Sequence, residues 1–389
     1  MLTVLFLFSC KPSVTPDDEC DVGEIEVDGT CVPLIAEDSC PIGQMRQLGA
    51  ECIDVGVTEC PEGFEADSRG WGCVPIVATS CEAGTRPVLG EAACAPVGTT
   101  SCETGFEPSA SGWGCVDIIP PDPCTGATRE ALGSTTCLPI GDCNAPFPPV
   151  NTNIFVDDDY GAADLDDTHF ANLSDALAVT IGGDIIAVEA GEYPDNTWNI
   201  TQNMDIVGRC PDQVRFTATA TGKRGFSIQQ GTLATISGLT LSGYWRALEV
   251  NGGSTGNASD MVIEDSLQYG VYVVEADSSL TLSDTMVRNV TYYSTSPSAG
   301  IDINDGGELT MSNTTIVDAT MYGLHMSEDA TATVTDSVIM NTTPNLQGDY
   351  GVGVSAELDS TLTILRGAVA GNVEGGVVAS YASEVGILD

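Results

Sequence analysis

Apolar and polar residues alternate in short runs over the C-terminal part of the chain, from residue 234 to residue 389. A ten-residue phrase recurs there, of the form Leu-Thr-(Leu/Ile/Val)-Ser-(Asp/Asn)-(Ser/Thr)-x-(Ile/Val)-x-(Asn/Asp). Alternation with a period of two is typical of β-strands and not of helices. The phrase starts at Ala234, Gly256, Leu280, Leu309, Ala332 and Leu362, at intervals of 22, 24, 29, 23 and 30 residues. A period in this range indicates a repeat architecture.

Each phrase is followed by a turn and a second predicted strand. These strands span residues 247–250, 270–273, 300–303, 323–326, 351–354 and 376–379, and all but the first open on an aligned glycine. From the end of the phrase to that glycine there are 5 residues after Asp265, Asp318 and Gly371, but 11 after Asn289 and 10 after Asn341. Two loop insertions therefore explain the two long intervals.

Coils of this length, with two or three strands and no helix between them, predict a parallel β-helix. Each coil then pairs only with its neighbours, so residues far apart in sequence form columns. We expect Leu282, Met311, Val334 and Ile364 to stack above one another. The phrase-ending column of Asp265, Asn289, Asp318 and Asn341 is either a ladder of paired polar side chains or a row of solvated turns. The pattern restarts at residues 385–389, which predicts a chain truncated inside a seventh coil.

An apolar run opens the chain at residues 1–10 and is too short to span a bilayer. It is typical of the core of a signal peptide. Residues 7–10, Leu-Phe-Ser-Cys, resemble a bacterial lipoprotein box, in which Cys10 would be acylated. Phe8 is bulky for its position and no Lys or Arg precedes the run, so an ordinary signal segment is the alternative and the true start codon stays open.

Fifteen cysteines support export. Twelve of them fall in six short modules, which are too small to bury a sufficient core and for which disulfides are the usual remedy. Zinc is disfavoured, because there is no Cys-x-x-Cys and the two histidines are His169 and His325. Pairing within each module is the first prediction, although sequence alone does not fix connectivity. It gives Cys20–Cys31, Cys40–Cys52, Cys60–Cys73, Cys81–Cys94, Cys102–Cys115 and Cys124–Cys137.

Composition limits the partners. The chain has 12 Lys and Arg against 56 Asp and Glu, a formal net charge of −44, which disfavours nucleic acid and anionic membrane surfaces. We expect a signal or lipobox segment at 1–19, a stalk of six cysteine modules at 20–143, a Pro-rich linker at 144–151 and a β-helix at 152–389. A partner-binding role for the stalk is the alternative to a spacer.

Residues 154–210 carry a resemblance to a known family. A strand at 154–159, a helical apolar spacing at 169–179 and a Gly-Asp-x-Ile-x-Val-x-x-Gly-x-Tyr strand from Gly183 to Tyr193 are similar to the N-terminal cap and first coil of pectin-lyase-like right-handed β-helices. The resemblance implies an all-β, right-handed parallel β-helix with a short capping helix. It implies no single activity, since that superfamily includes lyases, hydrolases, epimerases and non-enzymes.

Two further predictions concern the start of this region. Cys143 and Cys210 remain after the modules are paired, and a bond between them would tie the stalk to the first coils. The acidic loop at 157–167 is a candidate Ca²⁺ site, with Asp157, Asp159, Asp164 and Asp166 as ligands, because alternate carboxylates suit a hard cation. A solvated acidic loop is the alternative.

Aromatic residues gather at the turn before the second strand in five consecutive coils. Three of them, Tyr269, Tyr322 and Tyr350, precede a glycine that the alignment places in one column. They suggest a groove walled by the two insertions, in which sugar rings stack on apolar faces, or else a packing ladder. The predicted ligand-binding residues are Tyr244, Trp245, Tyr269, Tyr292, Tyr293, Tyr322 and Tyr350.

The outward positions of the second strands supply candidate catalytic groups. They read Glu249, Tyr272, Asp302, His325, Gly353 and Val378. Coils stack about 4.8 Å apart, so Asp302 and His325 are expected to interact, and Glu249 is a further candidate acid. The paired acids of polygalacturonases and the Arg-and-Asp set of pectate lyases, which this fold resembles, are absent from the sequence.

We therefore predict a non-catalytic protein that binds a polysaccharide or another surface partner, with no cofactor other than Ca²⁺. A polysaccharide lyase or glycoside hydrolase is the alternative, and a purely structural envelope protein is a third. An outer-membrane or cell-surface lipoprotein, held to the membrane only by its lipid, is the expected location; a secreted protein is the alternative.

Overall fold

The computed structural model describes residues 20–388, apart from 21–23, 34–39, 42–43, 47–51, 55, 57–58, 69–71, 83, 98–100, 111–113, 195–196, 219 and 292–296. The described residues form two compact units that divide between residues 100 and 101, except that 109–114 group with the first. The predicted signal segment and Cys10 lie outside the described residues. No helix in the described part of the chain is long and apolar enough to cross a membrane.

Each cysteine module contains one antiparallel hairpin and one disulfide. The hairpins pair β1 (Glu24–Val27) with β2 (Thr30–Pro33), β3 (Gln44–Arg46) with β4 (Cys52–Asp54), β5 (Phe64–Ala66) with β6 (Cys73–Pro75), β7 (Thr85–Arg86) with β8 (Ala95–Pro96), β9 (Phe106–Pro108) with β10 (Cys115–Asp117), and β11 (Thr128–Arg129) with β12 (Leu138–Pro139). The disulfides join the cysteines within each module, as expected, and Cys143 bonds to Cys210. Such a set of disulfides is characteristic of an exported protein.

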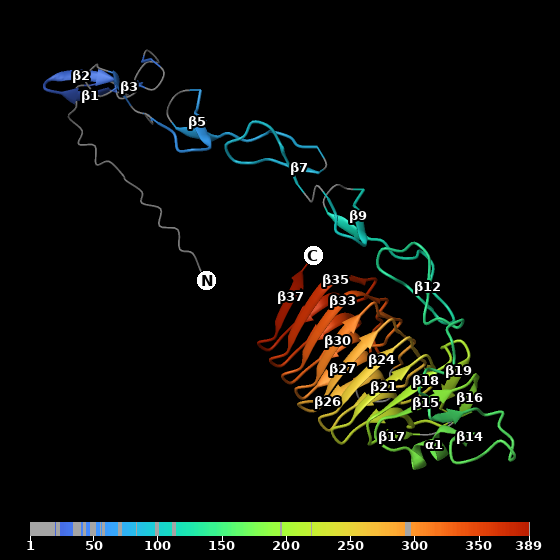
Figure 1. The fold of residues 1–389 in the computed structure, drawn as a ribbon. Coiled ribbons are helices and arrows are strands. Elements are labelled where there is room, and N and C mark those ends of the chain that lie inside the picture. Colours follow the sequence, from blue (N-terminus) through green and yellow to red (C-terminus); the bar gives the residue numbers. More distant parts are fainter. Residues whose placement is uncertain are drawn as a thin grey trace. The chain divides into compact units, whose positions relative to one another are not determined.

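Residues from 154 onward wind into a stack of coils (Figure 1). The turn of each coil separates strands that belong to two parallel sheets, a large sheet and a second sheet. The large sheet contains β13 (Ile154–Val156), β14 (His169–Phe170), β15 (Asp184–Val188), β16 (Gly191–Pro194), β18 (Met204–Gly208), β19 (Val214–Thr217), β21 (Leu233–Ser237), β22 (Thr240–Ser242), β24 (Thr255–Ser259), β25 (Val262–Glu264), β27 (Ser279–Ser283), β28 (Met286–Arg288), β30 (Glu308–Ser312), β31 (Thr315–Val317), β33 (Thr331–Met340), β35 (Thr361–Ala370) and β37 (Glu384–Leu388). The second sheet contains β17 (Trp198–Ile200), β20 (Arg224–Ile228), β23 (Arg246–Val250), β26 (Tyr269–Val274), β29 (Ala299–Asn304), β32 (Tyr322–Met326), β34 (Val352–Ala356) and β36 (Gly375–Ala379).

The register confirms the predicted columns. Leu282 pairs with Met311, Met311 with Val334 and Val334 with Ile364. All four side chains are buried in one core that continues from coil to coil. Alternate residues of each strand point into the coil, and these are the apolar ones. Each coil thus covers the apolar residues of its neighbours.

The phrase-ending column forms turns. Asp265, Asn289, Asp318 and Asn341 all have positive φ, between 55° and 59°. Asn and Asp are tolerated in this left-handed conformation, whereas most other side chains clash with the following carbonyl. The Nδ2 of Asn289 donates to Oδ1 of Asp265 at 3.2 Å, so one pair of this column is also joined along the stack.

The aligned glycines mark a close approach of successive coils. A Cβ on Gly300 would lie 2.7 Å from the carbonyl oxygen of Gly323, and a Cβ on Gly323 would lie 2.5 Å from that of Gly353. No side chain fits at such distances. The glycine of the fifth coil is therefore Gly353 and not Gly351, because the insertion after Asn341 is two residues longer than the sequence alignment assumed.

A short helix closes the N-terminal end of the stack. Helix α1 (Leu173–Val179) lies at the green end of the coils in Figure 1. Asn172 caps it, since Oδ1 of Asn172 accepts the backbone N–H of Asp175. Leu173 and Ala176 are buried in the core of the coils, so the helix shields the first coil from water.

The sixth cysteine module packs on the large sheet and belongs to the second compact unit. Cys124, Ala127 and Ile140 form an apolar cluster with the outward side chains of Val262, Met286 and Val317. The Arg129 guanidinium pairs with Asp284 at 3.1 Å, and the Thr315 hydroxyl donates to the carbonyl of Glu130. The two compact units thus divide near residue 100, before most of the fifth module, whereas the sequence analysis places the end of the stalk at residue 143.

Candidate functional site

The strongest grouping of polar and aromatic side chains lies on the outward face of the second sheet. One column of this face continues from Asn199, and the part from Ser227 onward, here called the Asp302 column, has one member in each of seven coils. Its members are Ser227, Glu249, Tyr272, Asp302, His325, Ser355 and Val378. The predicted order holds from Glu249 to His325, but Ser355 replaces Gly353, because the second strand of that coil starts two residues later than expected.

Asp302 and His325 form a hydrogen-bonded pair between neighbouring coils. Asp302 is only 1% exposed, and its other carboxylate oxygen accepts from Nδ2 of Asn304 at 2.5 Å. Burial by itself lowers the pKa of His325, but the hydrogen bond to Asp302 and the charge of that carboxylate outweigh it and raise the pKa above 6.5. The pair therefore holds a proton more tightly than an exposed histidine does.

Tyrosine rings flank this pair on both sides. Tyr269 stacks on Tyr272 with ring centroids 5.0 Å apart, and Tyr322 lies 4.6 Å from the His325 ring and 5.2 Å from Tyr350. Burial, followed by the charge of Asp302, raises the pKa of both Tyr269 and Tyr272, so their phenols stay protonated. The phenols are hydrogen-bond donors at neutral pH.

Glu249 stands at the N-terminal end of the group and is matched by arginines. Its carboxylate lies 3.3 Å from Nε of Arg224 and 3.7 Å from Nη1 of Arg246. The Arg246 guanidinium also covers the rings of Trp245 and Tyr272, at 4.4 and 4.2 Å from their centroids. Arg246 thus joins the charged and aromatic parts of the face, and no other coil carries an arginine at its position that would have drawn attention to it except Arg224.

The predicted aromatic set is only partly brought together. Tyr244 is 0% exposed and packs inside the core against Trp198, so it cannot contact a ligand. Tyr292 and Tyr293 lie outside the described residues. Val352, and not Tyr350, occupies the position of Tyr322 in the next coil, although Tyr350 reaches Tyr322 from the loop and is 43% exposed.

Ser227 and Ser355 are two further members that the sequence analysis did not identify. They lie in the Asp302 column, two coils before Tyr272 and next after His325, and they are 1% and 2% exposed. The Ser355 hydroxyl donates to Glu357 at 2.9 Å. Extending the coil alignment one coil upstream would have found Ser227, since it occupies the same period-two position.

The acidic loop does not gather its carboxylates around a common point. Oδ1 of Asp157 accepts the N–H of Asp159, and Oδ2 of Asp164 accepts the N–H of Gly161. Hydrogen bonds from His169 and Thr168 lower the pKa of Asp166 far below its usual value. Among the described residues, no three His, Cys, Asp or Glu side chains lie close enough to hold a metal ion. The predicted Ca²⁺ ligands therefore serve turns.

Stacked parallel coils with a shared core define the chain as a parallel β-helix. The model of the family described as right-handed β-helix region matches residues 154–339 and, in a second match, 283–389. The chain belongs to this family, and its crossovers are right-handed.

Comparison with solved structures found distant similarity. The pectate lyase Pel9A shares 13% identity at a TM-score of 0.40, over 60% of this chain and 69% of that one. A mannuronan C-5 epimerase A-module from Azotobacter vinelandii shares 12% identity at a TM-score of 0.22, over 55% of this chain and 90% of that one. The ORF18 protein of Geobacillus virus E2 shares 11% identity at a TM-score of 0.26, over 55% of this chain and 58% of that one. No curated protein matched the sequence.

Proposed function

We propose that the protein binds a glycan along the Asp302 column, without turning it over. The observation that carries this proposal is the buried Asp302–His325 pair set among Tyr269, Tyr272 and Tyr322. A sugar chain needs donors and acceptors for its hydroxyls and apolar faces for its rings, and side chains fixed on rigid strands bind at little entropic cost. Tyr269 and Tyr322 are only 6% exposed, so the ring at this face that is most open to a sugar is that of Tyr350, which is 43% exposed.

An uncharged glycan fits this face better than an acidic one. The chain carries a formal net charge of −44, which repels polyanions at long range. The two arginines of the face, Arg224 and Arg246, share the single carboxylate of Glu249. An incoming carboxylate or sulfate would have to compete with Glu249 for them.

The face is tested by binding of the full chain to uncharged and to anionic polysaccharides on a glycan array, followed by titration of the best ligand. Tyr350→Ala removes an exposed ring at the edge, and Asp302→Asn removes the charge at the centre. We expect each to weaken binding about tenfold or more, since a stacked ring or a charge-assisted hydrogen bond contributes about 1.5 kcal/mol. Asp305→Asn, an exposed carboxylate outside the column, is the matched control. Binding that survives both test variants would exclude this face.

A polysaccharide lyase or hydrolase is the second candidate. It is favoured by one observation, the hydrogen bond that orients His325 and raises its pKa, since a carboxylate that orients a histidine is a common arrangement for proton transfer. Hydrolysis needs two carboxyl groups about 5 to 9.5 Å apart.

Release of reducing ends or unsaturated products from bound polysaccharides, with and without Ca²⁺, tests this candidate. Turnover abolished by His325→Gln and Asp302→Asn would replace the binding proposal, and neither binding nor turnover would leave a structural envelope protein.

The location is a separate proposal. Acylated Cys10 would anchor the chain to an outer membrane, and the cysteine modules would hold the β-helix away from the surface. Mass spectrometry of the mature N-terminus of the exported chain tests this proposal, with Cys10→Ser as the control. A mature N-terminus without a lipid would favour a secreted protein.

A further inference from the structure

The sixth cysteine module covers the large sheet incompletely and leaves a cavity of about 260 Å³ beneath it. Cys124 and Glu130 line it from the module, and three successive coils line it with Glu264, with Arg288 and Asn289, and with Val317 and Asp318. Its walls are apolar at Val317 and at the Cys124–Cys137 disulfide, and polar elsewhere. The cavity is large enough for a small organic ligand and lies on the other sheet from the Asp302 column.

One carboxylate oxygen of Glu130, a residue that lines this cavity, is buried and lacks a partner. Glu130 is 1% exposed, and its Oε1 accepts the backbone N–H of Cys124 at 2.7 Å. Its Oε2 is buried and has no hydrogen-bond partner among the described residues. Burying such an atom without a donor is unfavourable by about 1–3 kcal/mol, and more for a charged group. The arrangement is therefore incomplete without a donor that enters the cavity.

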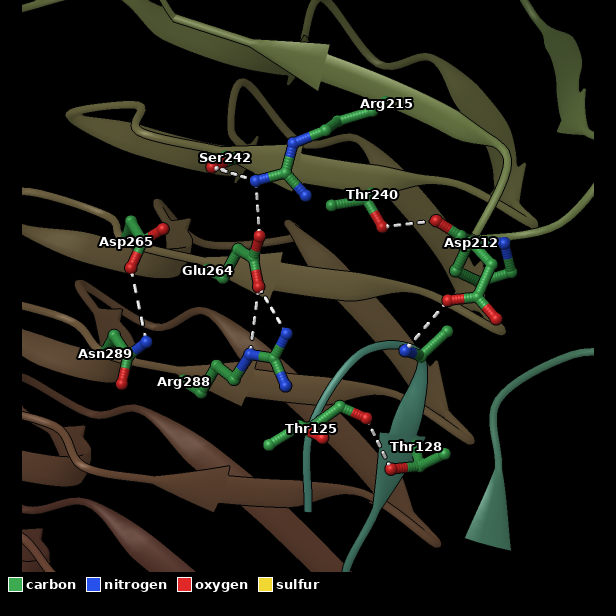
Figure 2. Close-up of polar contacts among 12 residues, drawn as sticks. Thr125, Thr128, Asp212, Arg215, Thr240, Ser242, Glu264, Asp265, Arg288 and Asn289 are labelled. Carbon is green, nitrogen blue, oxygen red and sulfur yellow. Dashed lines mark hydrogen bonds and ion pairs between the residues drawn. The ribbon is translucent and has the colours of Figure 1, made fainter. Parts of the chain in front are cut away.

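The cations nearby are not available to supply that donor. The Glu264 carboxylate, which is 7% exposed, accepts from Arg215 on one oxygen and from Arg288 on the other, with 2.9 Å from Nε of Arg288 (Figure 2). Burial disfavours the charge of Glu264, but the two guanidinium groups more than offset it and lower its pKa. Glu264 and its arginines thus form a closed set on the cavity wall.

Two other residues that line the cavity, Asp318 and Asn289, carry hydrogen-bond acceptors. Asp318 lies at the rim, and in the described part of the chain neither Asp318 nor Glu130 takes part in an ion pair. The Nδ2 of Asn289 is used by Asp265 (Figure 2), which leaves Oδ1 of Asn289 as an acceptor. Two carboxylates and one amide oxygen match the three N–H donors of a primary ammonium group. The third carboxylate of the lining, Glu264, is held by its two arginines, and among the described residues no three His, Cys, Asp or Glu side chains are placed to hold a metal ion.

We propose that this cavity binds a small ligand through a primary ammonium group, with the apolar stem against Val317 and the disulfide. The chemistry has two natural sources, the lysine side chain of another protein and an amino sugar. In both, Glu130 is the central contact and Asp318 the outer one. The site is independent of the proposed glycan face, because no residue is shared between the two.

Isothermal titration of the full chain with two probes tests the cavity and separates the sources. n-Butylammonium stands for a lysine side chain, with n-butanol as its uncharged control. D-Glucosamine stands for an amino sugar, with N-acetyl-D-glucosamine as its control. We expect saturable binding of one equivalent of one probe and none of its control; the probe that binds identifies the source. If neither probe binds saturably, or if a control binds as well as its probe, the proposal is wrong.

Two variants locate the binding. Glu130→Gln keeps the shape and the bond to the N–H of Cys124 but removes the charge, so affinity should fall about tenfold or more. Because it also removes an unpaired buried carboxylate, it should raise the thermal midpoint of the ligand-free protein. Asp318→Asn keeps a side chain that tolerates the left-handed turn, and should weaken binding several-fold with no change in the midpoint. The matched control Asp305→Asn should leave both quantities unchanged. Unchanged affinity in both Glu130→Gln and Asp318→Asn would overturn the proposal, whatever the midpoints.

Discussion

The cysteine modules and the β-helix use opposite means to hold a chain with many short strands. In the first compact unit, no residue whose exposure the structure describes is buried, and each hairpin is held by one disulfide that closes a loop of 11 to 13 residues. The β-helix has the single disulfide Cys143–Cys210 at its start and a core that runs through all its coils. A disulfide closes each module within itself, with a few contacts to the next such as the backbone hydrogen bond from Gly90 to Ile76, whereas stacking makes every coil depend on its neighbours.

The largest expected effect is the loss of stacking at a coil contact. A Cβ on Gly300 would lie 2.4 Å from Cγ2 of Ile316 and 2.7 Å from the carbonyl oxygen of Gly323. Gly300→Ala should therefore lower the free energy of unfolding of the β-helix by about 3 kcal/mol, the upper part of the range for overpacking. Chemical denaturation measures it. Gly182→Ala, where the added Cβ meets nothing within 4 Å, is the control. Equal stability of the two variants would show that coils shift apart freely.

The next effect should stay within one module. The pair Cys60→Ser and Cys73→Ser opens a loop of sequence separation 13 and should remove about 3 kcal/mol from that hairpin, while the β-helix unfolds as before. Limited proteolysis near residue 66 measures the loss of order in the hairpin, and calorimetry measures the unfolding of the β-helix. Replacing Cys124 and Cys137 by Ser should leave the sixth module more ordered than the Cys60–Cys73 module after its double substitution. The sixth module also packs on Val262, Met286 and Val317. If both double variants are cleaved at the same rate, packing on the sheet adds nothing to the sixth module.

A smaller effect is expected at the turns of the β-helix. Asn313 is exposed and has a φ of 46°, in the left-handed region. Asn313→Ala should lower the free energy of unfolding by about 1 kcal/mol, whereas Asn313→Gly should change it little. Denaturant titration of both variants is the measurement. A stable alanine variant would mean that the turns, unlike the glycine contacts, adjust without strain.

The smallest expected effect is on pH dependence. The pKa of His325 is raised above 6.5 in the folded chain, so the stabilisation it provides is fully present below about pH 6.5 and is lost as the pH rises through the folded value. The difference in stability between the wild type and His325→Gln should therefore shrink as the pH rises past that value. Thermal midpoints across this pH range measure it, and Asp302→Asn should remove the dependence. A difference that grows with pH would contradict the proposed charge state.

Sequence alone could predict the repeating part of the molecule to the level of single columns. The alternation of apolar residues and the spacing of glycines placed Glu249, Tyr272, Asp302 and His325 in one column, because strand pairing has a fixed period. The alignment slipped at the fifth coil, where a long insertion separates the phrase from its second strand and several glycines compete for one position. Tyr244 was misplaced because it lies in a turn, where alternation no longer tells inward from outward.

The packing of the sixth module on the large sheet could not be predicted from the sequence for a different reason. Its contacts join residues that are 85, 155 and 185 positions apart, such as the N–H of Ala127 and the Asp212 carboxylate, and no repeat relates them. The unpaired oxygen of Glu130 follows from that packing. Its burial was therefore visible only in the structure.

The two insertions of the β-helix leave from the same edge, and β29 and β34 resume their pairing with the preceding coil once each loop has ended. Thr342 and Thr343 still contact the neighbouring coils, but residues 345–349 can lengthen, shorten or exchange their side chains while the strands on either side keep their partners. Selection can remodel what this edge meets without rebuilding the scaffold, so relatives with the same coils are expected to differ most in these two loops.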